Sequence, residues 1–295
     1  SDFWPMLITE THARDIPVLF ASAQLSPRSY KNWQQRKPLA AAMFGCARRI
    51  YCVDDAQNAI FASLRSDISS DTIITHGSLK VSVSSLVADE TYGNMLKQAA
   101  AGRPILVCAS THNAEEKMLI EALARCSVDG FSVYCVMAPR HPTRTDAVAA
   151  LMPKVGRRSH SDTPSAETDY YLNDTLGEMG SLFAVADLVF LGGSLVPLGG
   201  HNPLEPALFG APLLSGPFID KNKSEFAALE ALGTATIMPP LTDHNSMMTS
   251  LTQTIQQALK ALPPTKKQKQ ASQNYAQNAC SRADLIADYI CTHFL

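Results

Sequence analysis

The stretch LVFLGGSLVPLGGHNPLEP at residues 188–206 decides the fold class. Its first part, 188–191, is apolar throughout, which is typical of a strand that helices cover on both faces of a sheet. A glycine-bearing loop follows, and a helix start follows the loop. Short apolar runs recur between amphipathic segments at 18–20, 49–53, 72–75, 105–109, 132–138 and 212–214. This alternation indicates βαβ units, and we expect a doubly wound α/β fold with parallel sheets.

Two segments carry the signals of a helix start at the carboxyl end of a strand. Asn202 suits the N-cap, Pro203 suits the first helical position, and Glu205 completes a capping box. Thr175 and Glu178 repeat that spacing one helix earlier. Helix N-termini attract phosphate, and open α/β sheets bind ligands at this edge. We expect a phosphate-bearing ligand there, although capping alone is the simpler interpretation of each carboxylate.

The composition of the loop before Glu205 favours binding over capping. Several glycines, His201 and Asn202 surround this carboxylate, and helix stability does not require such a density. A carboxylate beside a nucleotide can accept hydrogen bonds from both hydroxyls of a ribose, as acidic residues do in dinucleotide-binding folds. Glu205 is therefore a candidate nucleotide ligand.

Two further strand ends supply candidate site residues. Arg140 and Arg144 lie in a proline-stiffened loop, where planar guanidinium groups can each donate two hydrogen bonds to a phosphate. Solvated arginines are an equally good interpretation. The other strand end carries three polar residues, for which helix capping or no role in binding is the simpler interpretation: Ser110, Thr111 and His112.

Composition and missing motifs exclude several classes of protein. The formal net charge is -2, so no global positive field attracts nucleic acid. The 7 cysteines form no CxxC pair, which indicates reduced thiols in a cytosolic setting and argues against structural zinc. We expect neither a membrane span nor an export signal. The patterns GxGxxG, Walker A, HExxH, GxSxG and DxD are all missing, so the corresponding oxidoreductase, NTPase, protease, hydrolase and metal-chelating sites lose support.

Changes in composition divide the chain into four parts. We expect a partial N-terminal lobe at 1–83, an inter-lobe connection at 84–101, a nucleotide-binding lobe at 102–262, and a terminal helix at 263–295 that packs across the lobes. The basic stretch at 266–269 is interpreted as a solvated loop, with contact to anionic headgroups as the alternative.

The ordered motifs closely resemble those of the 3-deoxy-D-manno-octulosonic acid (Kdo) transferases of lipopolysaccharide synthesis. The longest block joins residues 174–178, 190–197, 199–206 and 216–217. Shorter motifs follow the family's order: Phe3-Trp4-Pro5, Leu25-Ser26 with Arg28-Ser29, Gly77 with Leu79-Lys80, Ser110-Thr111-His112 with Glu115-Glu116, and Pro139-Arg140-His141-Pro142. The resemblance runs from the first residues to about Phe226.

The resemblance implies a GT-B-like α/β fold of two Rossmann-type lobes with a cleft between them. It implies an inverting, metal-independent transfer of Kdo from CMP-Kdo to a lipid A precursor at the cytoplasmic face of the inner membrane, with no cofactor and no nucleic-acid partner. Arg28 and Lys80 fall on the acceptor side. The donor-binding residues carried over by motif are Ser110, Thr111, His112, Arg140, Gly177, Glu178, Ser194, Asn202 and Glu205.

The sequence departs from the family pattern on the acceptor side. Gln24 stands where the family usually has an arginine. The first half of the family's N-terminal lobe, with its membrane anchor and the glutamate that serves as catalytic base, has no counterpart, so we expect an incomplete lobe. Asp2 is a weak candidate for the missing base. The alternatives are a truncated or degenerate relative that binds CMP or a partner without catalysis, and a relative that uses another nucleotide-sugar.

Overall fold

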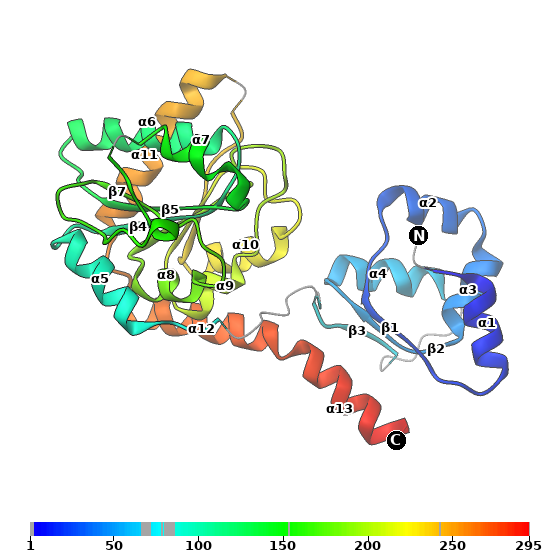
Figure 1. Cartoon of the computed structure of the whole chain (residues 1–295). Helices are drawn as coiled ribbons and strands as arrows, with labels where there is room; N and C mark the ends of the chain where they lie inside the picture. The colour runs from blue at the N-terminus through cyan, green and yellow to red at the C-terminus, as the bar shows by residue number, and fades with distance from the viewer. Residues whose placement is uncertain are drawn as a thin grey trace. The chain divides into compact units, whose positions relative to one another are not determined.

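A computed structural model describes residues 3–65, 72–77, 79, 86–152, 154–241 and 243–294. The chain divides into two compact units, which are coloured along the sequence in Figure 1. The smaller unit comprises Ser1–Ser82 together with Asn278–Leu295, and the larger unit comprises Val83–Gln277. Each unit is built on its own parallel sheet.

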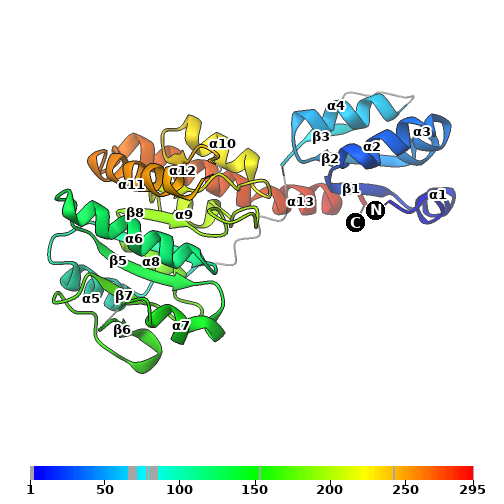
Figure 2. The ribbon, with the colours of Figure 1, turned by 90° about the horizontal axis from the view of Figure 1, so that it is seen from above.

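The smaller unit contains a three-stranded sheet in the order β1-β2-β3. The strands are β1 (Val18–Ala23), β2 (Ala47–Cys52) and β3 (Ile73–Thr75), and both pairings are parallel. Figure 2 shows that three helices lie together on one side of these strands: α2 (Pro27–Gln34), α3 (Lys37–Gly45) and α4 (Asp55–Leu64). The unit also contains α1 (Pro5–Ala13) and α13 (Arg282–Phe294).

Alternate side chains of β2 pack on opposite faces of the small sheet, and each face contacts different helices. Ile50 and Cys52 are fully buried in the core that α3 and α4 cover. On the other face, the Arg49 guanidinium lies 3.8 Å from the ring centroid of Tyr289 in α13, and Tyr51 makes an edge contact with the same ring. Successive side chains of a strand point to opposite faces, so this pattern places α13 against the second face of the small sheet.

The larger unit contains a seven-stranded sheet in the order β10-β9-β8-β4-β5-β7-β6, with every pairing parallel. Its strands are β4 (Ile105–Thr111), β5 (Tyr134–Pro139), β6 (Gly156–Arg157), β7 (Tyr170–Leu172), β8 (Leu188–Leu191), β9 (Leu213–Ser215) and β10 (Ala235–Ile237). Its helices are α5 (Glu90–Ala100), α6 (Glu115–Val128), α7 (Thr145–Ala149), α8 (Met179–Val185), α9 (Leu204–Leu208), α10 (Lys223–Ala231), α11 (His244–Lys260) and most of α12 (Lys266–Cys280), with two 3₁₀ turns at Pro142–Arg144 and Arg158–His160.

In the larger unit, both faces of the central strands are buried in the core. Leu106 and Cys108 of β4 pack in one cluster with residues of α6 and α11, such as Leu123 and Leu251. Val107 is fully buried on the opposite face, where Figure 1 shows α5 and α8. The continuous apolar runs of the sequence are therefore strands with two covered faces, and the predicted α/β class with parallel sheets is confirmed.

Three strands were not predicted from the sequence. β6, β7 and β10 have 2, 3 and 3 residues, which is too short for a periodic pattern to stand out. β7 illustrates this, because its residues Tyr170–Leu172 follow a polar loop and are held by pairing with β5 rather than by their own periodicity.

Two segments outside the predicted lobes differ from the expected pattern. The stretch expected as an inter-lobe connection, 84–101, contains α5, whose Tyr92 and Leu96 are buried and which belongs to the larger unit. The basic stretch at 266–269 lies in the first turn of α12 rather than in a loop, so that interpretation is wrong. The Thr265 hydroxyl accepts a hydrogen bond from the Gln268 N–H, and the Gln268 side chain accepts one from the Thr265 N–H. This capping box begins the helix.

Candidate functional site

A buried glutamate organises the glycine-bearing loop after β8. The Glu115 carboxylate accepts backbone hydrogen bonds from Gly193 at 2.8 Å and from Ser194 and Leu195 at 2.9 Å, and also from His112 at 2.9 Å. Burial raises the pKa of Glu115, and these hydrogen bonds oppose the shift. All four partners are donors, so the geometry fits the ionised carboxylate. The loop amides that a phosphate would otherwise bind are therefore already occupied.

Two glycines allow the loop after β8 to touch the end of β4 and the loop after β9 through their backbones. A Cβ at Gly192 would lie 2.3 Å from the Ser110 carbonyl oxygen, and one at Gly216 would lie 2.2 Å from the Ser194 carbonyl oxygen. The fully buried Ser194 hydroxyl donates to the Leu191 carbonyl and accepts from the Gly216 N–H. The side chain of Ser194, a predicted donor-binding residue, is thus engaged within the fold.

Three histidines meet where β4, β5 and β8 end. The Nε2 atoms of His112 and His201 are 2.8 Å apart, with nearly parallel rings, and the His141 ring lies edge-on to His112. Burial lowers the pKa of His201 to about 4, and the charges of His112, Arg140, Lys221 and His141 add to the shift. Burial and then His141 also lower the pKa of His112. One ring must donate to the other, so at least one of the pair is neutral.

The arginines of the loop after β5 differ in their partners. Arg144 donates to both carboxylate oxygens of the buried Glu116, at 2.9 and 3.2 Å. Arg140 is held through its backbone N–H, which donates to the Thr111 carbonyl, and its exposed guanidinium has no hydrogen bond or ion pair within the described part of the chain. Its charge nevertheless opposes the raised pKa that burial imposes on Glu205. Arg140 is thus available to an anionic ligand.

Glu205 and Asn202 do not form the predicted capping box. α9 begins at Leu204, and the side-chain oxygen Oδ1 of Asn202 accepts from the Leu204 N–H at 3.1 Å, as the predicted cap would. The Glu205 side chain makes no reciprocal bond to the Asn202 N–H within the described part of the chain. The Glu205 side chain is partly buried, and its carboxylate has no hydrogen-bond or ion-pair partner among the residues that the structure describes. The loop is held instead by Asn222, whose side-chain amide donates to the carbonyls of Gly200 and His201. Because α9 begins at Leu204, Glu205 is its second residue rather than the third, and it has no capping role.

The predicted capping box at Thr175 and Glu178 is also wrong. The Arg158 guanidinium donates to both oxygens of Glu178, and the Thr175 hydroxyl donates to the same carboxylate instead of capping the backbone. Burial raises the pKa of Glu178, but the hydrogen bonds from Arg158 and Thr175 outweigh burial and lower it. A Cβ at Gly177 would meet no atom within 4 Å, so this glycine borders open space.

The topology brings most of the predicted donor residues to one edge of the larger sheet. The carboxyl ends of β4, β5 and β8, which are neighbours, carry Ser110, Thr111, His112, Arg140, Ser194, Asn202 and Glu205. Gly177 and Glu178 follow β7, the strand next to β5. Of the predicted acceptor-side residues, Arg28 lies exposed in the first turn of α2, whereas Lys80 and the candidate base Asp2 fall outside the described residues.

Sequence reasoning did not assign a role to Glu115, Asn222, Arg158 or Lys221. Glu115 was noted only within a family motif, and its partners lie about eighty positions away along the chain. Asn222 and Arg158 likewise act on loops from other strands. A local pattern does not show such partners.

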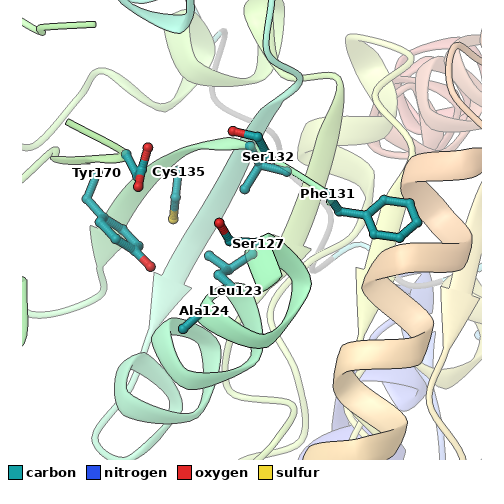
Figure 3. A pocket seen from close by; sticks show the side chains of 9 residues that line it. Leu123, Ala124, Ser127, Phe131, Ser132, Cys135 and Tyr170 are labelled. Atoms are coloured by element: carbon teal, nitrogen blue, oxygen red, sulfur yellow. The ribbon is translucent and has the colours of Figure 1, made fainter. Parts of the chain in front are cut away.

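The pocket in Figure 3 lies away from this site. It has a volume of about 340 Å³ and is lined by residues at the beginnings of β5 and β7 and the end of α6, including Cys135, Tyr170 and Ser127. These strand beginnings are at the opposite edge of the parallel sheet from His112 and Arg140. Ligands of open α/β sheets bind at the carboxyl edge, so we assign the site there.

The described residues include neither a metal-binding cluster nor a membrane-spanning helix. They contain no group of three or more His, Cys, Asp or Glu side chains placed to hold a metal ion. Among them, no helix has the length and apolar character needed to cross a bilayer.

Known proteins resemble both units of the chain. The 3-deoxy-D-manno-octulosonic-acid transferase (kdotransferase) model matches residues 1–83. The 3-deoxy-D-manno-octulosonic acid transferase of Haemophilus influenzae is 31% identical over 224 residues, which cover 73% of this chain and 51% of that protein. The chain spans about half the length of the curated relatives that it matches.

Solved structures resemble the chain as well. The C-terminal CMP-Kdo binding domain of WaaA from Acinetobacter baumannii is 27% identical, with a TM-score of 0.49, and the match covers 66% of this chain and 99% of that domain. UDP-GlcNAc 2-epimerase from Neisseria meningitidis is 13% identical, with a TM-score of 0.56 over 96% of this chain and 71% of that one, which shows a shared fold alone. The family model, the relatives and the ordered motifs show that the chain belongs to the Kdo transferase family.

Proposed function

We propose that the larger unit binds CMP-Kdo at the carboxyl edge of its sheet, and that the chain serves the transfer of Kdo to a lipid A precursor. The relatives in the preceding comparison carry the name of this activity. Transfer proceeds with inversion and without a metal ion or cofactor, at the cytoplasmic face of the inner membrane. These finer points follow from the family resemblance.

The main observation in support of a donor site is that the Arg140 guanidinium and the Glu205 carboxylate lie near each other, each without a partner among the described residues. Arg140 lies at the end of β5, and its charge acts on both Glu205 and His201. A guanidinium without a protein partner can donate two parallel hydrogen bonds to a phosphate. A carboxylate without one can accept hydrogen bonds from ribose hydroxyls. The pair therefore matches the two polar parts of a nucleoside monophosphate.

The other groups at the carboxyl edge of the larger sheet also favour recognition of the donor by side chains rather than by backbone amides. Glu115 occupies the amides of residues 193–195, and α8 and α9 have only 7 and 5 residues, so backbone groups contribute less than the sequence indicated. Lys221 adds positive charge close to His201. The anionic phosphate is then held chiefly by Arg140 and its neighbouring side chains.

We propose that Arg28 contacts the anionic acceptor. It lies exposed in the first turn of α2, two residues after the N-cap Ser26, and has no ion-pair or hydrogen-bond partner in the described part of the chain. Lys80 is assigned to the same side from the motif alone.

Binding of CMP without catalysis is the second candidate function. The candidate base Asp2 falls outside the described residues, and among the described ones Asp54 is a carboxylate at the carboxyl end of β2. Asp54 accepts the Gln57 N–H at 2.7 Å as the N-cap of α4, so it is engaged in holding a helix. A general base contributes typically 10²- to 10⁴-fold to such a transfer, so its identity decides between the two functions.

Isothermal titration with CMP tests the donor site. We expect Arg140→Ala and Glu205→Gln each to weaken CMP binding by about tenfold or more, since hydrogen bonds to charged groups contribute roughly 1.5–3 kcal/mol. Arg125→Ala is the matched control, because Arg125 forms an exposed ion pair with Glu121 on α6. Failure of the wild-type chain to bind CMP would contradict the proposal, and competition by UDP would favour another nucleotide-sugar.

An assay of Kdo transfer then separates the two functions. Release of CMP from CMP-Kdo only in the presence of lipid A precursor supports transfer by this chain. CMP binding without any such release supports the non-catalytic alternative.

A further inference from the structure

Glu115 is the point where the loops of two strands are tied together. It stands in the first turn of α6, directly after the loop that follows β4, and its side chain is fully buried. Its Oε2 atom accepts the N–H groups of His112 and Gly193, while Oε1 accepts those of Ser194 and Leu195. One carboxylate thus joins the end of β4 to three successive residues after β8.

The same carboxylate sets the distance between two histidines on these loops. His112 is bonded to Glu115 through its own N–H. His201 is fixed to the other loop, because its N–H donates to the Gly192 carbonyl and the Gly200 N–H donates to the Gly193 carbonyl. Since Oε2 holds His112 and Gly193 at once, it fixes the backbones that carry both rings. The rings then meet with their Nε2 atoms 2.8 Å apart.

The carboxylate also decides which groups remain for a ligand. Successive backbone N–H groups in a turn form a concavity that binds anions. Here Glu115 is the anion in that concavity, supplied by the protein itself. A ligand phosphate at this edge is therefore left with side-chain donors.

We propose that Glu115 is the positioning residue of this site: by filling the amide concavity after β8 it holds His112 against His201 and leaves phosphate recognition to the side chains around Arg140. This inference rests on the proposed function only where it concerns the phosphate.

The first test uses the unmodified chain, with backbone amide hydrogen exchange measured by NMR with and without CMP. We expect the N–H groups of Gly193, Ser194 and Leu195 to be protected in the free protein and their protection to be unchanged by CMP. Fast exchange of these amides in the free protein, followed by protection when CMP is added, would overturn the inference. The free-protein measurement decides the role of Glu115 even if CMP does not bind.

The second test uses Glu115→Gln. A glutamine side chain of the same shape turns one acceptor oxygen into an NH₂ donor that faces two backbone N–H groups, so the loops must separate. We expect the His201 ring to titrate near the ordinary histidine pKa instead of at about 4, and CMP binding to weaken by about tenfold or more. A folded variant with the wild-type histidine titration and wild-type CMP affinity would refute the positioning role.

Asp187→Asn is the control for a general loss of stability. The Asp187 carboxylate also accepts a backbone N–H, that of Ile105 at 2.9 Å, but at the amino edge of the same sheet. We expect it to leave the histidine titration and the CMP affinity unchanged. A change in the histidine titration of Asp187→Asn equal to that of Glu115→Gln would show that the readout follows stability, and would count against the inference.

Discussion

Arg140 and Arg144 show how much the fate of a residue depends on its partner. They stand four positions apart after the same strand, and only the family motif, not the local pattern, distinguishes Arg140 from Arg144. In the folded unit, Arg144 forms an ion pair with the buried Glu116. The Arg140 guanidinium has no such partner in the described part of the chain. Burial of Glu116 makes its pairing obligatory, since an unpaired buried charge costs several kcal/mol. The unpaired arginine is the one that can bind a ligand.

His201 makes a prediction about pH. Its pKa in the folded protein is lowered by burial to about 4, with His112, Arg140, Lys221 and His141 facing it, whereas the unfolded chain has the ordinary value near 6.5. Between these values the unfolded state binds more protons, so the stability that neutral His201 contributes is present above pH 6.5 and is lost as the pH falls toward 4.

Replacement of His201 by glutamine should therefore flatten the loss of stability between pH 6.5 and 4, as measured by urea unfolding over this range. His244→Gln, at the start of α11, serves as the control that keeps the wild-type slope. An identical pH slope in wild type and His201→Gln would contradict this account.

At the scale of elements, the end of β4 and the loops after β8 and β9 depend on glycines that let backbones touch. Gly192→Ala places a Cβ 2.3 Å from the Ser110 carbonyl oxygen, and backbone atoms cannot move aside easily. We expect a loss of about 3 kcal/mol in the free energy of unfolding of the larger unit, from urea denaturation.

Gly102→Ala is the matched control for this substitution. Gly102 has a positive φ but open space around it, so only the backbone conformation is penalised, by about 1 kcal/mol. If Gly192→Ala were no more destabilising than Gly102→Ala, the close approach of the loop after β8 to the end of β4 would be wrong.

At the scale of the whole molecule, the candidate donor site is contained within the larger unit. Every contact that defines it, from Glu115 to Asn222, joins residues between Val83 and Gln277. A fragment of residues 83–277 should therefore bind CMP with a Kd within about threefold of that of the full chain, measured by isothermal titration.

Arg28→Ala in the full chain provides the complementary control, because Arg28 belongs to the smaller unit and should not change the CMP affinity. A folded fragment that binds CMP more than about tenfold weaker than the full chain would contradict a self-contained site.

The sequence by itself determined the α/β class and the strands that carry most of the site. The runs at 105–109 and 188–191 are apolar on both faces because helices cover both sides of the sheet. A continuous apolar run of this kind can be recognised in the sequence without any knowledge of the contacts. The motif order along the chain also identified the family. These features depend on residues that are close together in the sequence, so they can be predicted from the sequence alone.

The tertiary structure alone decided which polar groups are engaged and which remain available to a ligand. The same local patterns predicted capping boxes at Glu178 and Glu205, yet Arg158 claims the first carboxylate and no described residue claims the second. Glu115 acts on amides about eighty residues away. Electrostatic and hydrogen-bonding roles are set by burial and by neighbours from other strands, and those neighbours exist only once parallel strands bring their carboxyl ends to one edge.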